Sequence, residues 1–122
     1  MENYIIGMPS MIQEAWHVPS DAEFTQLTDY LGIGAGTKMK STSGWKDNGN
    51  GTNESGFSGL PGGYRFTNGD YYSIGYYGLC WSSTQNDATN AWSRALNCSS
   101  SAVYRFTKGF KEIGFSVRCL RN

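Results

Sequence analysis

The spacing of apolar side chains predicts one well-defined helix near the start of the chain. The residues SDAE at positions 20–23 form a capping box, in which the serine hydroxyl and the glutamate side chain satisfy each other's backbone amides. Apolar residues of one helical face follow, namely Phe24, Leu27 and Leu31. Gly32 then supplies a left-handed stop. The pattern therefore predicts a helix from Ser20 to Leu31 with one buried stripe.

The remainder of the chain alternates apolar and polar residues between turn signals, which is typical of short strands. We expect a strand at residues 16–18, ended by Pro19, and further strands at Tyr64–Phe66, Cys80–Ser82, Ala91–Leu96, Ala102–Phe106 and Phe115–Leu120. A second short helix is expected at Ala35–Lys40. Residues 41–63 are rich in Gly, Asn, Ser and Thr, and we expect an ordered loop pinned to the core by Phe57 and Leu60. Helices first and strands afterwards indicate an α+β domain with an antiparallel sheet.

Length and charge narrow the range of functions. A chain of 122 residues makes a single domain, 1–122. Ten basic and ten acidic side chains cancel, so neither nucleic acid nor an anionic membrane is an expected partner. No apolar run reaches the roughly 20 residues of a membrane span, and the first residues lack the pattern of a signal peptide. The chain is therefore expected to be cytoplasmic or phage-borne, or a domain of a longer exported protein.

The residues that bind metals or carry covalent chemistry are few. None of the three cysteines has C-x-x-C spacing and His17 is the only histidine, so we expect no zinc site, no metal and no cofactor. His17 is interpreted as a structural histidine. The oxygen-rich residues 47–54 leave a structural cation open, although Asn-Gly clusters are usually plain turns.

Ordered sequence blocks extend from Trp16 to the C-terminus: WHVPSDAEF, LTDYLG, GTKMKSTSGW, NGTNESGFSGLPGGYR, WSST, AWSR and GFSVRC. Together they resemble the Fibrobacter succinogenes major paralogous domain. That family is similar to the C-type lectin fold, which also underlies formylglycine-generating enzymes. The resemblance implies two helices flanking small antiparallel sheets, with a loop-rich face for ligands. It also implies a cell-surface, extracellular or phage-particle location.

One segment departs from the family's text at positions where Asn or Tyr is expected. The departing residues are Ala95, Cys98, Ser99, Ser100, Ala102, Tyr104, Phe106, Thr107, Gly109, Phe110 and Ile113. The segment resembles the variable region of a diversity-generating retroelement protein, because each of these residues is reachable by changing the first two bases of an Asn codon. The resemblance implies that the eleven residues form a ligand-binding face for a protein or glycan on a cell surface.

Three aromatic residues of this segment, Tyr104, Phe106 and Phe110, are expected to anchor the ligand. They could instead be core residues of a strand. Val103 and Arg105 alternate with Tyr104 and Phe106, so one of these two sets faces away from the core. If Val103 packs inward, the aromatic rings are exposed and Arg105 needs a partner, such as a carboxylate. We favour the exposed arrangement, which is typical of binding hot spots.

A further departure concerns Cys119. The family often carries a Cys-Pro shortly before the Trp-His, and this chain has no cysteine at residues 11–15, so the partner that the resemblance implies for Cys119 is missing. We expect a free thiol there.

Two other functions stay open. The chain could be a structural or assembly module of a bacterial surface protein, in which the same segment is simply divergent. The least favoured is an oxidase of the formylglycine-generating type that uses Cys80, Cys98 or Cys119. Only Arg118 and Arg121 are placed in the sequence to lower a thiol pKa.

Overall fold

The first helix has the boundaries that its sequence predicts. The computed structural model describes residues 15–122, with the side chains of residues 108 and 109 excepted, and in it α2 spans Asp21–Leu31. The Ser20 hydroxyl accepts from the Glu23 amide at 3.1 Å, and the Glu23 carboxylate accepts from the Ser20 amide at 3.0 Å. Gly32 ends the helix with a φ of 71°. Phe24 is fully buried, which confirms the apolar stripe.

The second helix, α3, spans Ala35–Met39 and leads into the long loop. The core cluster contains Met39, Trp45 and Leu96, with Leu27, Leu31, Phe57, Cys98 and Val103 packed against it. The prediction that Phe57 pins the loop is therefore confirmed. The prediction for Leu60 is wrong, since its side chain is 67 % exposed. Backbone contacts hold this part of the loop, because the Gly63 amide donates to the Tyr77 carbonyl at 2.8 Å.

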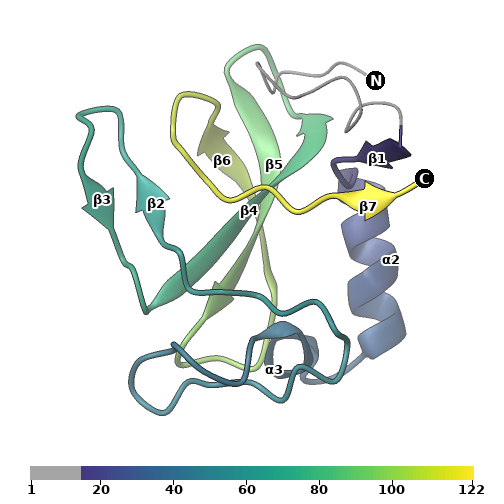
Figure 1. The fold of residues 1–122 in the computed structure, drawn as a ribbon. Coiled ribbons are helices and arrows are strands. Elements are labelled where there is room, and N and C mark those ends of the chain that lie inside the picture. The colour runs from purple at the N-terminus through teal and green to yellow at the C-terminus, as the bar shows by residue number, and fades with distance from the viewer. Residues whose placement is uncertain (1–14) are drawn as a thin grey trace.

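The described strands form three small antiparallel sheets. Their bounds are β1 Trp16–His17, β2 Tyr64–Arg65, β3 Tyr71–Tyr72, β4 Tyr77–Gln85, β5 Asn90–Asn97, β6 Tyr104–Phe110 and β7 Leu120–Arg121. The central sheet has the order β4-β5-β6, while β1 pairs with β7 and β2 pairs with β3. Helix α2 packs against β4 and β5, and Figure 1 shows the β2–β3 hairpin on the other side of the central sheet. The fold class is therefore α+β.

Two expected strands differ from the structure. A continuous strand at residues 115–120 is wrong, because only Leu120 and Arg121 form β7. The preceding residues pair singly, Gly114 with Arg65 and Ser116 with Cys80. Successive parts of this segment have different neighbours, so the alternation in the sequence does not reflect one ladder. The other difference is β6, which begins at Tyr104 rather than at residue 102.

The described part of the chain contains no helix long and apolar enough to cross a membrane. The residues at 11–14, where the family's Cys-Pro would be expected, lie outside the described residues.

Candidate functional site

Strands β5 and β6 place two of the expected aromatic residues side by side. Tyr104 lies opposite Ala95 and Phe106 lies opposite Ser93, so both point to the same face of the sheet. Their rings are 42 % and 45 % exposed, and the ring centroids are 6.4 Å apart. Val103 packs inward against the core cluster. The expected exposure of Tyr104 and Phe106 is therefore confirmed.

Phe110 lies on the other face of the sheet, away from these two rings. Phe110 pairs with Asn90, whereas Phe106 pairs with Ser93. Asn90 and Ser93 are three positions apart in β5, so their side chains point to opposite faces, and so do those of their partners. The register shifts between these pairs, so β6 carries an extra residue there. Phe110 is 55 % exposed, but it is not part of the same aromatic pair.

The other expected site residues are distributed unevenly. Ser99 and Ala102 are exposed, while Cys98, Ser100, Thr107 and Ile113 are half-buried. Gly109 lies in β6 opposite Ala91. Ala95 is 1 % exposed, so it supports the face from beneath and cannot touch a ligand itself. The structure thus brings together a smaller set, which we call the β6 face: Ser100, Tyr104 and Phe106. The Tyr104 hydroxyl donates to the Ser100 hydroxyl at 3.0 Å, and the two rings lie side by side.

The loop that begins the β6 face is held by buried parts of the scaffold. Lys40 is a buried residue, and its ammonium donates to the carbonyls of Asn97 at 3.0 Å and Ser100 at 3.2 Å. The Gly36 amide donates to the Ser101 carbonyl at 2.8 Å. Burial lowers the pKa of Lys40, and the two carbonyls partly offset its lost hydration. The shape of this loop therefore depends on α3 and the residue that follows it.

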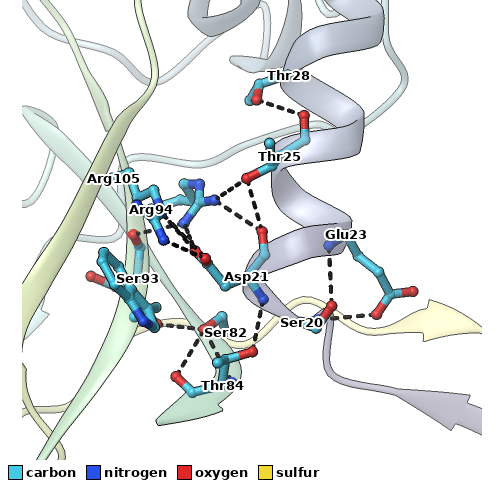
Figure 2. Close-up of polar contacts among 11 residues, drawn as sticks. Ser20, Asp21, Glu23, Thr25, Thr28, Ser82, Thr84, Ser93, Arg94 and Arg105 are labelled. Carbon is cyan, nitrogen blue, oxygen red and sulfur yellow. Dashed lines mark hydrogen bonds and ion pairs between the residues drawn. The ribbon is translucent and has the colours of Figure 1, made fainter. Parts of the chain in front are cut away.

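Arg105 has the carboxylate partner that its position required. The Asp21 carboxylate accepts from Arg105 at 2.6 Å and from Arg94 at 2.6 Å, which joins α2 to β5 and β6 (Figure 2). Hydrogen bonding to Arg105, and next to Arg94, holds the pKa of Asp21 below its ordinary value. The Arg105 guanidinium also lies 3.5 Å from the centroid of the Trp92 ring. This network fixes β6 while Tyr104 and Phe106 point the other way.

A comparison with protein families identifies the scaffold. The model of the Fibrobacter succinogenes major domain matches residues 8–121. The chain belongs to this family. Comparisons with curated proteins and with solved structures found no match.

In this Fibrobacter succinogenes major domain a further exposed aromatic residue, which sequence reasoning missed, lies on the same side of the sheet. Tyr77 pairs with Asn97 in the β4–β5 ladder, so it points to the same side as Ala95 and Tyr104. Its side chain is 37 % exposed. The sequence signal for its orientation was the alternation of Tyr77, Leu79 and Trp81, which places these three side chains on one side of a strand. Only the pairing of β4 with β5 relates that alternation to a segment so distant in the chain.

The three cysteines of the domain were the candidates for covalent chemistry. Cys80, Cys98 and Cys119 are all free and half-buried. Burial raises the pKa of Cys80 to about 11, so its thiol stays protonated at neutral pH. Among residues 15–122, no group of three His, Cys, Asp or Glu side chains could hold a metal ion.

His17 makes the stability of the domain depend on pH. Its ring lies 2.9 Å from Glu23 and 2.7 Å from the Asn122 side chain, and these contacts raise its pKa above the ordinary value of 6.5. Because the pKa of His17 is higher in the folded than in the unfolded protein, protonation of His17 stabilises the fold. This stabilisation is complete below pH 6.5 and is lost as the pH rises through the pKa of His17 in the folded state. We expect the melting temperature to fall modestly over that range. His17→Gln should remove this pH dependence of the melting temperature. A variant whose melting temperature varies with pH as the wild type's does would contradict the prediction.

Proposed function

We propose that this chain is a non-enzymatic recognition domain that displays a diversified binding face on a C-type-lectin-like scaffold. The observation that carries the proposal is the exposed pair of rings, Tyr104 and Phe106, on a strand that buried groups hold in place. Exposed aromatic residues on a rigid support are typical of interaction hot spots. The ligand is a protein or glycan on a cell surface, and the domain acts at a bacterial surface or on a phage particle.

The division of the segment into fixed and variable positions supports diversification by a retroelement. By the resemblance to the family, Leu96, Val103 and Arg105 are the positions of the segment that do not depart from its text. Each has a structural partner: the core cluster for Val103 and Leu96, and Asp21 for Arg105. Of the departing residues, Ser99, Ala102, Tyr104, Phe106 and Phe110 are exposed. Exposed side chains can change at little cost in stability, whereas buried ones change at a cost of a few kcal/mol.

An enzymatic role receives less support from the described residues. The cysteine chemistry of a formylglycine-generating oxidase needs an accessible thiolate, whereas burial keeps the Cys80 thiol protonated. This counts against Cys80 as the reactive thiol of such an oxidase, and a non-enzymatic domain remains our proposal.

The β6 face is tested by the double variant Tyr104→Ala/Phe106→Ala. Because both rings are partly exposed, we expect a loss of less than about 2 kcal/mol in the free energy of unfolding, against about 3–5 kcal/mol for one buried aromatic residue. Binding of the labelled domain to a glycan array and to bacterial cells should fall at least about tenfold. Tyr30→Ala/Tyr71→Ala, which removes two exposed rings elsewhere, is the control. Retained binding, or a loss of stability of core size, would refute the proposal.

Diversification has a separate test that needs no ligand. Deep sequencing of the gene segment for residues 95–113 in a host population should find substitutions among the eleven departing positions, most of them at the exposed ones, with Leu96, Val103 and Arg105 unchanged. A neighbouring reverse transcriptase gene and an Asn-codon-rich near-repeat of the segment are also expected. A uniform segment without that near-repeat would leave a structural or assembly module as the better explanation.

A further inference from the structure

A pocket of about 330 Å³ lies on a different part of the molecule from the β6 face. It is enclosed by α2, the β1–β7 ribbon and the loop at residues 55–57, and none of its lining residues belongs to the 95–113 segment. Its walls are mainly apolar and include Trp16, Phe24, Leu27, Phe57 and Leu120. The volume is at the lower end of the range for small-molecule sites.

Two arginines line this apolar space, and neither has an acidic partner within the described part of the chain. The Arg118 guanidinium lies 5.2 Å from the centroid of the Phe57 ring, and that of Arg121 lies 5.3 Å from the Trp16 ring. Neither forms an ion pair with any residue between 15 and 122. A guanidinium that is not engaged in an ion pair has N–H groups that match the geometry of a carboxylate or sulfonate.

The acidic residue of the pocket wall does not neutralise these charges. The Glu23 carboxylate accepts from the Ser20 amide at 3.0 Å and contacts the His17 ring at 2.9 Å. Hydrogen bonding to the Ser20 amide is the largest cause of its lowered pKa. Glu23 is thus committed to the helix cap and to β1, and among the described lining residues two arginines stand against this one acid.

We propose that this pocket binds a small amphipathic anion. The apolar body of the ligand lies among Trp16, Leu27 and Phe57, and its anionic head accepts hydrogen bonds from Arg118 and Arg121. Charge complementarity selects the head, and the apolar walls select the body. The site is independent of ligand recognition by the β6 face.

The test compares two fluorescent probes with similar apolar bodies. Anilinonaphthalene sulfonate carries an anionic head, and phenylnaphthylamine does not. We expect the wild-type domain to bind the sulfonate saturably at one site, and octanoate to displace it where octanamide does not. Arg118→Gln/Arg121→Gln should weaken sulfonate binding at least about tenfold and leave the neutral probe nearly unaffected. Arg65→Gln, which removes an exposed arginine outside the pocket, should bind as the wild type does.

Tyr104→Ala/Phe106→Ala separates this site from the β6 face, since that variant should retain sulfonate binding. Sulfonate binding that is absent, that survives loss of both arginines, or that disappears with the two aromatic rings would overturn the inference. If circular dichroism shows that the double arginine variant is unfolded, Arg121→Gln alone decides, because Arg121 is exposed in a two-residue strand. Unweakened sulfonate binding in that single variant would also overturn it.

Discussion

Replacing Asp21 by asparagine is expected to lower the free energy of unfolding by about 3 kcal/mol. The carboxylate is the shared partner of Arg94 and Arg105, and the Arg94 side chain is only 5 % exposed. Asparagine keeps the size of the side chain and removes its charge. The buried Arg94 cation then loses its only charged partner among the described residues and keeps neutral acceptors, the Asp21 carbonyl and the Thr25 hydroxyl, each at 3.0 Å. Arg105 contributes less to this loss, because its side chain is 48 % exposed.

Chemical denaturation of the variant and the wild type measures this difference. Asp29→Asn is the matched control, because Asp29 is an exposed acid on the same helix and is expected to change stability by less than about 0.5 kcal/mol. The wild type should also lose stability in acid. The lowered pKa of Asp21 stabilises the fold above the carboxyl group's ordinary pKa, and this contribution disappears as the pH falls through the folded value. Equal stability of Asp21→Asn and Asp29→Asn would show that the network does not hold β6.

Replacing Gly36 by alanine is expected to destabilise the domain by about 2 kcal/mol and to displace the loop at residues 100–103. A Cβ at this position would overlap the Ala102 carbonyl oxygen and would lie 2.7 Å from that of Ser101. Both obstacles are backbone atoms, so no side-chain rotation relieves the overlap. Alanine favours a helix over glycine by up to about 1 kcal/mol, which is too little to compensate.

The displacement has its own measurement. Amide chemical shifts of Ser101 and Ala102, together with faster hydrogen exchange at the Ser101–Gly36 contact, should report the moved loop. Gly62→Ala is the control, because a Cβ there meets only the Ser116 hydroxyl oxygen at 3.3 Å. Since the displaced loop carries Ser100 of the β6 face, Gly36→Ala should weaken ligand binding without altering a ligand-contacting side chain. Unchanged shifts at residues 101 and 102 would contradict the close approach.

Local signals predicted the helices well and the strands less well. The capping box, the apolar face and Gly32 act within one helix, and α2 follows them within one residue. The strand expected at residues 115–120 depended instead on neighbours from β2, β4 and β1. The alternation of apolar and polar residues indicates which side chains share a face of a strand, but it does not indicate which other strand lies beside it.

By itself, the sequence determined the family, the α+β class, and the alternation that turns Tyr104 and Phe106 away from Val103. The tertiary structure alone decided which of the eleven expected site residues meet. Ala95 is buried by its place in the sheet, and the extra residue in β6 turns Phe110 to the opposite face. The pairing of Arg105 with Asp21 likewise joins residues far apart in the chain. Register and contacts of this kind are set by cross-strand and helix–sheet packing, which no local pattern encodes.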